Sequence, residues 1–368
     1  MAKPTYVLIM AGGIGSRFWP LSSTERPKQF LDILGTGQTL LQQTFNRFAG
    51  MVPAENIYII TAGNYVSIVR EQLPQLPTQN IIAEPMRRNT APCIAYLSFK
   101  LINDQPEATL IVAPADHQIL DEPGFVNVCN RAIRFVETRE ALVTLGIQPT
   151  HPSTGYGYIQ KHPMAVDSFV YPVKQYIEKP YLELAKSFLK NEEFLWNSGI
   201  FIWKIKDVLK AFETYLPDLY QLFYASAGVM NTEAESEAVH ALYALCPNIS
   251  IDVGIMEKSD KVFIIPSAFE WSDLGTWNSA WENMPKDYRW NAVTGKNVKM
   301  IDAANCVVHS PPGKTVIIQG LDNYIIADTD KGLLICRKDK EQEIKEYVAE
   351  MFKPPEEAVP AQPTGKAT

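Results

Sequence analysis

Continuous apolar runs alternate with helical patterns along the first 145 residues of the chain. The runs show no polar alternation, which is typical of strands in a sheet that is covered on both faces. We therefore predict an α/β fold with a doubly wound, mostly parallel sheet, in which ligands bind beyond the carboxyl ends of the strands. The predicted strands are Tyr6–Met10, Ile57–Thr61, Ile81–Ala83, Thr109–Ala113 and Ala141–Leu145.

The pattern changes twice along the rest of the chain. From Pro152 to Pro285 aromatic-rich strands mix with helices, and after Asn291 five short β runs are split by turn residues. We predict a first domain over residues 1–285 and a small C-terminal β unit over residues 286–340, for which a β-helix is one arrangement. Residues 341–368 are expected to form a terminal helix and a loose tail rich in Pro and Ala.

Composition excludes several classes of protein. The 368 residues carry 34 basic and 41 acidic side chains, a formal net charge of −7, so no basic footprint for nucleic acid or an anionic membrane is expected. No apolar run approaches the ~18 residues of a membrane-spanning helix. The apolar stretch after Lys3 enters a glycine loop instead of a cleavage site, so a cytoplasmic location is expected. Five widely spaced cysteines without a C-x-x-C pattern indicate reduced thiols.

A glycine-rich loop follows the first predicted strand. Its glycines let the backbone approach a ligand closely, and their N–H groups can face phosphate oxygens. The dinucleotide fingerprint would need glycine where the chain has Phe18, which disfavours a dehydrogenase, and a Walker A motif does not fit. Alone, such a loop is as consistent with a tight strand–helix turn as with a phosphate site. The loop comprises Ala11, Gly12, Gly13, Ile14, Gly15, Ser16 and Arg17.

The segment Arg26-Pro27-Lys28-Gln29-Phe30 turns this loop into a recognisable pattern. Together they resemble the sugar-nucleotide pyrophosphorylases, which join a sugar phosphate to a nucleoside triphosphate, and Pro-Lys-Gln-Phe resembles their mannose-1-phosphate guanylyltransferase branch. The resemblance implies a Rossmann-like, mixed and mostly parallel sheet of the nucleotidyltransferase type in the first domain. It also implies that Arg17 and Lys28 are catalytic cations on a triphosphate, and that the loop from Ala11 to Ser16 binds the nucleotide.

Two further segments extend the resemblance on the nucleotide side. Pro85–Pro92 is similar to the family segment beside the nucleobase, so Asn89 and Thr90 are implied to bind nucleotide, although alone they would indicate only a helix cap. Asp116 follows the fourth strand and Asp273 lies in Trp-Ser-Asp-Leu-Gly-Thr-Trp, where the family has its Mg²⁺ ligands. By itself Asp273 would be read as an N-cap. His117 is expected to support the site by hydrogen bonding.

Three motifs resemble the sugar-phosphate side of the family. They are Gly-Tyr-Gly-Tyr, Ile-Glu-Lys-Pro and Asn-Ser-Gly, which occur here in the family's order. The resemblance implies that Glu178 and Asn197 hold sugar hydroxyls, that Gly157 gives a backbone contact and that Lys179 reaches the sugar phosphate. The departure is small: Tyr176-Ile177 stands where the family often has Phe-Val before Glu-Lys-Pro.

The implied reaction transfers GMP from GTP to α-D-mannose 1-phosphate, giving GDP-mannose and pyrophosphate with Mg²⁺ as cofactor. The attacking phosphate oxygen is already an anion, so no general base is needed. One alternative is a glucose-1-phosphate thymidylyl- or uridylyltransferase of the same fold, and another is a silent sugar-nucleotide-binding regulator. Longer relatives carry a fused isomerase with histidine ligands, whereas only His309 follows residue 290 here. A single-activity enzyme is therefore expected, and we predict a homodimer.

Overall fold

The computed structural model describes residues 3–13 and 15–352, and it forms two compact units. The first unit contains the residues up to Gly15 together with Thr24–Gly275, and the second contains Ser16–Ser23 and the chain from Thr276 onward. This division comes earlier than the domain boundary expected at residue 285. The short helix α9 (Trp277–Asn283) belongs to the second unit, because its buried Trp277 packs on Phe18 of that unit with ring centroids 5.2 Å apart.

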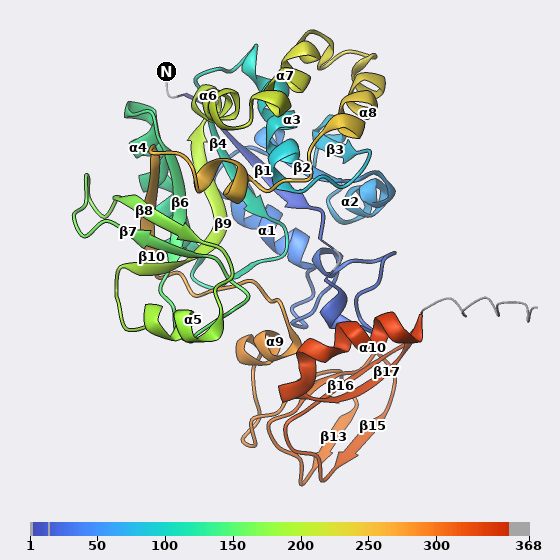
Figure 1. Cartoon of the computed structure of the whole chain (residues 1–368). Coiled ribbons are helices and arrows are strands. Elements are labelled where there is room, and N and C mark those ends of the chain that lie inside the picture. The colour runs from blue at the N-terminus through green and yellow to red at the C-terminus, as the bar shows by residue number, and fades with distance from the viewer. Residues whose placement is uncertain (1–2, 14, 353–368) are drawn as a thin grey trace, which may run out of the picture. The chain divides into compact units, whose positions relative to one another are not determined.

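The first unit is built on a nine-stranded mixed sheet in the order β3-β2-β1-β4-β9-β6-β10-β8-β7 (Figure 1). Strands β3, β2, β1 and β4 run parallel, and so do β6 and β10, whereas β9 is antiparallel to both of its neighbours β4 and β6. Strand β7 pairs with β8 and also with β9, so five strands close back on themselves. The strands are β1 Thr5–Ala11, β2 Ile57–Ala62, β3 Ile81–Glu84, β4 Thr109–Pro114, β6 Leu142–Ile147, β7 Tyr158–Lys161, β8 Tyr171–Ile177, β9 Phe194–Lys204 and β10 Val262–Ser267.

Helices cover both faces of this sheet, as the unbroken apolar strands predict. Val7 and Ile9 of β1 face a core shared with α1 and α4, whereas Leu8 faces the core of α3, α6, α7 and α8. In Figure 1 α1 and α3 accordingly flank the central strands. The helices are α1 Leu40–Ala49, α2 Val66–Gln72, α3 Thr90–Ile102, α4 Glu122–Thr138, α5 Leu182–Phe188, α6 Ile205–Tyr215, α7 Pro217–Ala225 and α8 Glu235–Leu245.

The second unit is a small coil of short strands. Strands β12, β14 and β16 pair in parallel, as do β13 and β15, and β17 closes one side antiparallel to β16. Cys306, Val308 and Ile326 are among the residues of its separate apolar core. The elements are β12 Ala292–Thr294, β13 Val298–Ile301, β14 Val307–His309, β15 Val316–Gln319, β16 Tyr324–Thr329, β17 Gly332–Arg337, the 3₁₀ segments η1 (Ser16–Phe18) and η8 (Lys338–Glu343), and α10 Ile344–Met351.

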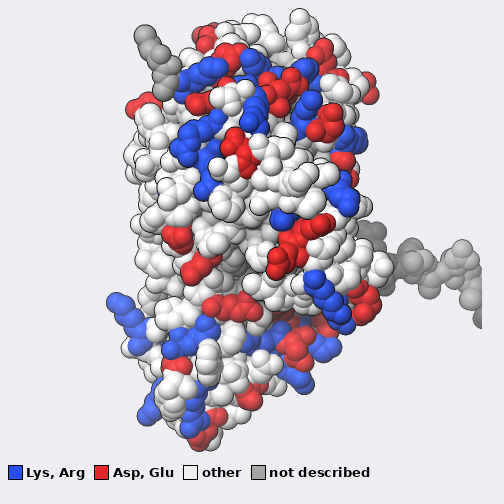
Figure 2. All heavy atoms as spheres, turned by 90° about the vertical axis from the view of Figure 1, so that its left-hand side faces the viewer, with Lys and Arg blue, Asp and Glu red and all other residues white. Residues whose placement is uncertain are grey.

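Two surface properties bear on the exclusions made from composition. On the face that Figure 2 shows, Lys and Arg side chains are interspersed with Asp and Glu. Among residues 3–13 and 15–352, no helix is long and apolar enough to cross a membrane. The predicted tail from Pro354 lies outside the described residues.

Candidate active site

The glycine loop after β1 is held from one side by the segment that follows it. Gln29, in the short 3₁₀ turn η2 (Lys28–Phe30), is buried and donates from Nε2 to the carbonyl oxygens of Ala11 and Gly13, both at 3.0 Å. Gly15 has φ +65°, and a Cβ atom there would lie 2.3 Å from the Cβ atom of Lys28. The loop and the Pro-Lys-Gln-Phe segment therefore form one interlocked piece of backbone.

Lys28 brings the two predicted metal ligands together. Its Nζ atom lies 3.0 Å from Oδ2 of Asp116 and donates to the backbone oxygen of Asp273 at 2.5 Å. The lysine is 4% exposed. Three residues that lie far apart in the sequence thus meet at the carboxyl ends of the strands, where the fold places ligands.

A short strand pair explains why Asp273 reaches this place. Strand β5 (Gln118–Ile119) follows Asp116, and β11 (Trp271–Ser272) precedes Asp273; the two pair antiparallel, with Ser272 opposite Gln118. Oδ1 of Asp273 accepts hydrogen bonds from the Tyr156 hydroxyl at 2.8 Å and from the Gly275 N–H at 3.0 Å. The carboxylate is therefore held in one orientation, and the backbone oxygen of the same residue is bound to Lys28.

Electrostatics keep the Asp116 carboxylate ionised. Burial raises its pKa, but the charges of Lys28 and His117 outweigh burial and hold the pKa below its usual value. His117 accepts a hydrogen bond at Nδ1 from the Trp271 indole at 3.2 Å, which agrees with the supporting role expected for it. Mg²⁺ prefers carboxylate oxygens as protein ligands and takes water and phosphate oxygens at its other positions, so the side chains of Asp116 and Asp273 fit the donor set of a Mg²⁺ site. No cluster of three or more His, Cys, Asp or Glu side chains suited to a metal occurs in the part of the chain that is described.

A cavity of about 420 Å³ opens beside this cluster. Gly12 and Gly13 line it together with Asn89, Thr90 and Asp116, so it joins five of the residues predicted to bind nucleotide or metal. Asn89 has φ +68° and caps α3 by accepting a hydrogen bond from the Thr90 N–H at 2.9 Å. The helix-cap role is therefore confirmed, and it places the positive end of α3 at the cavity.

The residues predicted for the sugar phosphate form a second group in the same unit. The Asn197 N–H donates to the Gly157 oxygen at 2.8 Å, and a Cβ atom on Gly157 would lie 2.7 Å from Oε2 of Glu178. Lys179 pairs with Glu178 at 2.7 Å and has an exposed side chain. Gly157, Glu178 and Asn197 are thus adjacent, and a side chain at position 157 would displace the carboxylate of Glu178 from its observed place.

Asp252 belongs to this second group, although the sequence analysis missed it. It begins a one-turn π-helix, η7 (Asp252–Met256), and its Oδ1 accepts a hydrogen bond from Asn197 Nδ2 at 2.7 Å. Burial raises the pKa of Asp252 to about 6; the Asn197 hydrogen bond opposes this rise, and the nearby charge of Glu178 adds to it. The available signal was a single acidic residue inside the apolar run Ile249–Met256.

Two predicted site residues lie in the other compact unit. Ser16 and Arg17 form η1 with Phe18, and Arg17 is exposed, whereas Lys28, Asp116 and Asp273 belong to the first unit. The roles of Ser16 and Arg17 therefore stay predictions.

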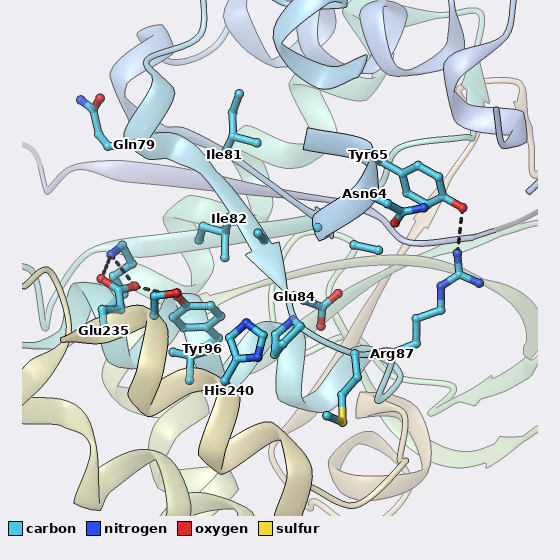
Figure 3. Close-up of a pocket in the computed structure, with 18 of the residues that line it drawn as sticks. Asn64, Tyr65, Gln79, Ile81, Ile82, Glu84, Arg87, Tyr96, Glu235 and His240 are labelled. Atoms are coloured by element: carbon cyan, nitrogen blue, oxygen red, sulfur yellow. Dashed lines mark hydrogen bonds and ion pairs between the residues drawn. The ribbon is translucent and has the colours of Figure 1, made fainter. Parts of the chain in front are cut away.

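A larger cavity of about 910 Å³ lies along the free edge of β3 and is lined also by α3 and α8 (Figure 3). Glu84, the last residue of β3, and Arg87 line this cavity and the smaller one as well. Arg87 donates to the Tyr65 hydroxyl at 3.1 Å, while Glu235 binds both Lys100 and the hydroxyl of Tyr96. The two cavities therefore adjoin at Glu84 and Arg87.

Comparisons with known proteins agree with this geometry. Residues 6–289 match the nucleotidyl transferase family, and residues 295–351 match the MannoseP isomerase/GMP-like beta-helix domain. The chain is 37% identical over 349 residues to the alginate biosynthesis protein AlgA of Pseudomonas syringae pv. tomato, covering 93% of this chain and 71% of that protein. It is 35% identical over 358 residues to a mannose-1-phosphate guanylyltransferase of Escherichia coli, covering 95% and 76%.

A solved structure gives the same result for the fold. A protein of Thermus thermophilus described as a mannose-1-phosphate geranyltransferase superposes with a TM-score of 0.85 at 30% identity, covering 94% of this chain and 99% of its own. The predicted fold class, a nucleotidyltransferase sheet followed by a β-helix-like unit, is confirmed.

Proposed function

Because this chain belongs to the nucleotidyl transferase family, and within it to the mannose-1-phosphate guanylyltransferases, we propose that it transfers GMP from GTP to α-D-mannose 1-phosphate. The products are GDP-mannose and pyrophosphate. The observation that carries the proposal is the meeting of Lys28, Asp116 and Asp273 beside the glycine loop and its cavity.

The reaction is an in-line displacement at the α-phosphorus of GTP by a phosphate oxygen of the sugar phosphate. The bond between the α-phosphorus and the α–β bridging oxygen of GTP breaks as the new P–O bond forms, and that oxygen leaves with pyrophosphate. The nucleophile is an anion, so the protein must position two anions and stabilise the charge on the leaving group. Lys28 supplies a fixed positive charge for the triphosphate, with Arg17 as the second cation. The N–H groups of Gly12 and Gly13 face its phosphate oxygens.

Asp116 and Asp273 are the side chains that would hold Mg²⁺, which when bound neutralises and templates phosphate oxygens. On the acceptor side, Glu178 and Asn197 bind hydroxyl groups of the sugar, and Asp252 fixes the Asn197 amide by accepting from its Nδ2 atom. The hydrogen bond at Nδ2 fixes the orientation of the Asn197 amide. The Oδ1 atom on its opposite side accepts a hydrogen bond from the Gly199 N–H at 3.1 Å. Lys179 orients the attacking phosphate.

The test is a grid of four nucleoside triphosphates against mannose, glucose and N-acetylglucosamine 1-phosphates with Mg²⁺. Pyrophosphate release is measured for each pair. We expect the highest kcat/KM for GTP with mannose 1-phosphate. A higher value for dTTP or UTP with glucose 1-phosphate would replace this proposal with the alternative transferase. Binding of sugar nucleotide without turnover in any pair would indicate a silent regulator.

A further inference from the structure

Tyr156 lies between the two groups of site residues, and no predicted role uses it. It is the first tyrosine of Gly-Tyr-Gly-Tyr and immediately precedes Gly157, whose carbonyl oxygen accepts from the Asn197 N–H at 2.8 Å. The hydroxyl of Tyr156 donates to Oδ1 of Asp273 at 2.8 Å. The backbone of Tyr156 thus adjoins the sugar-phosphate group, and its side chain contacts a predicted metal ligand.

The ring of Tyr156 is held by two tryptophans. Trp196 precedes Asn197 in β9, and its ring centroid lies 4.9 Å from that of Tyr156 in an edge-to-face arrangement. Trp271 of β11 lies 5.4 Å from Tyr156, also edge-to-face. Because such contacts act on the ring and not on the hydroxyl, the ring should stay in place when the hydroxyl alone is removed.

The hydroxyl is one of two donors that set the direction of the Asp273 carboxylate. The other is the Gly275 N–H, and both reach Oδ1, so together they fix where Oδ2 points. Gly275 is two residues away in the chain, whereas Tyr156 is 117 residues away and precedes β7. Hydrogen bonds of this kind orient carboxylates that ligate metals and affect their affinity for the ion. The orientation of Asp273 therefore depends on where the Tyr156 segment lies.

The same segment would respond to the sugar phosphate. Residues 148–157 form neither helix nor strand, and Gly155 is exposed. A sugar phosphate bound at Gly157 and Asn197 would restrain this segment and, with it, the Tyr156 hydroxyl. Ordering Asp273 for a cation then costs less, because its donor is already in place. Two ligands that order the same segment favour each other's binding.

We propose that Tyr156 is a positioning residue that couples cation binding at Asp273 to sugar-phosphate binding at Gly157 and Asn197. The coupling is reciprocal, so the cation strengthens sugar-phosphate binding by the same factor as the sugar phosphate strengthens cation binding. This inference rests on the proposed function, because it needs a divalent cation and a sugar phosphate in one site.

The test measures the Kd of α-D-mannose 1-phosphate on protein saturated with the α,β-methylene analogue of GTP, which cannot release pyrophosphate. Calorimetric titrations with saturating Mg²⁺ and with EDTA give two Kd values, and their ratio is the coupling factor. Such factors are typically about 5 to 150, and we expect Tyr156→Phe to lower the factor of the unaltered protein by about fivefold or more. The Kd in EDTA should not change, because phenylalanine keeps the ring contacts with Trp196 and Trp271.

Tyr158→Phe is the matched control. It removes the same atom from the second tyrosine of the motif, whose side chain is fully buried in the core of the first unit. We expect this variant to keep the coupling factor of the unaltered protein. A direct contact between the cation and the sugar phosphate would contribute equally in all three proteins and cancels in the comparison.

The outcomes separate this inference from the proposed function. Failure of the unaltered protein to form GDP-mannose would contradict the proposed function, and the sugar phosphate that binds best would then serve as the probe of Tyr156. A coupling factor of one in the unaltered protein would overturn the inference without any variant. So would a Tyr156→Phe protein that keeps the full factor. Equal weakening of sugar-phosphate binding with Mg²⁺ and with EDTA would show that Tyr156 has a structural role alone.

Discussion

Gly15 has no side chain, and this lets Lys28 pack against the glycine loop. Gly15→Ala would bring its Cβ atom to 2.3 Å from the Lys28 Cβ atom, which is fixed to the backbone, and would strain a φ of +65°. We expect a loss of about 1–3 kcal/mol in the free energy of unfolding. Gly12→Ala is the control, because nothing lies within 4 Å of its Cβ position. Urea unfolding of both variants measures the difference, and equal stabilities would contradict the interlock.

Lys28 is the residue whose charge the proposed chemistry needs most. Lys28→Ala should lower kcat by about 10²–10³, the scale for losing one preorganised electrostatic partner, and Arg17→Ala should do the same. Lys210→Ala is the control, because that exposed lysine pairs with Glu140 on the surface. Steady-state pyrophosphate release measures the effect. A loss of less than about threefold in both test variants would refute their catalytic assignment.

Glu84 should make stability depend on pH. Its pKa is about 7 in the folded state against 4.5 for an ordinary glutamate, so between these values the folded state binds a proton that the unfolded state has lost. Stability therefore falls as pH rises through this window and is lowest above it, by on the order of 3 kcal/mol. Tyr243 and Cys93 beside it stay neutral, because burial raises the pKa of each, and the charge of Arg87 limits the rise in the pKa of Glu84.

Glu84→Gln should remove this dependence and be more stable than the unaltered protein at pH 8. Denaturant unfolding of both proteins at pH 5 and pH 8 measures it. Asp252, whose pKa is also raised, contributes the same slope to both proteins and cancels in the comparison. A difference in stability that does not change between the two pH values would mean that Glu84 titrates normally.

At the scale of elements, the paired strands β5 and β11 show what sequence patterns could and could not predict. Continuous apolar runs such as Ile57–Thr61 predicted the parallel strands, and β2 (Ile57–Ala62) is found there. Helix α1 begins with a capping box formed by Thr39 and Gln42, in which both hydrogen bonds are present. The pair β5–β11 has two residues in each strand, too few for a period, yet it brings Asp273 to Asp116. Only the family resemblance pointed to Asp273.

Buried polar residues are the other feature that the sequence patterns could not predict. Asp252 and Glu84 occur as single acidic residues in apolar surroundings, and their use depends on partners more than 50 residues away, Asn197 and Tyr243. Periodicity carries no information about such partners. By contrast, the glycine loop and the Pro-Lys-Gln-Phe segment are close in sequence and could be recognised together, and in the structure they pack against each other.

Because the β5–β11 pair brings Asp273 to Asp116, we predict that Asp273 affects how activity depends on Mg²⁺. Asp273→Asn should lower turnover and shift the Mg²⁺ titration to higher concentrations, because a charged ligand is replaced by a neutral one. The asparagine keeps an oxygen for the Tyr156 hydroxyl and the Gly275 N–H, so the fold should survive. Activity measured against Mg²⁺ concentration, with thermal melting as the control, tests this. An unchanged titration would leave Asp273 with a structural role alone.

At the scale of the whole molecule, the residues predicted to act in catalysis and metal binding are divided between the two units. Lys28, Asp116 and Asp273 belong to the first unit, whereas Arg17 belongs to the second, although it follows β1 in the sequence. If Arg17 takes part in the reaction, activity requires that the second unit be folded. The predicted homodimer is a separate matter that stays a prediction.

Substitution in the second unit's own core can test this dependence. Ile326 is 5% exposed in the core around Cys306 and Val308, so Ile326→Ala should lower the stability of that unit by about 2–5 kcal/mol. Ile317→Ala, at a position 66% exposed on β15, is the control and should change it by less than about 0.5 kcal/mol. Hydrogen exchange of β14 and β16 reports unfolding of the second unit, and β1 and β4 report the first. We expect the temperature of inactivation of Ile326→Ala to fall together with protection of β14 and β16. Activity that persists after β14 and β16 have lost protection would show that Arg17 is dispensable and that the cations of the first unit suffice.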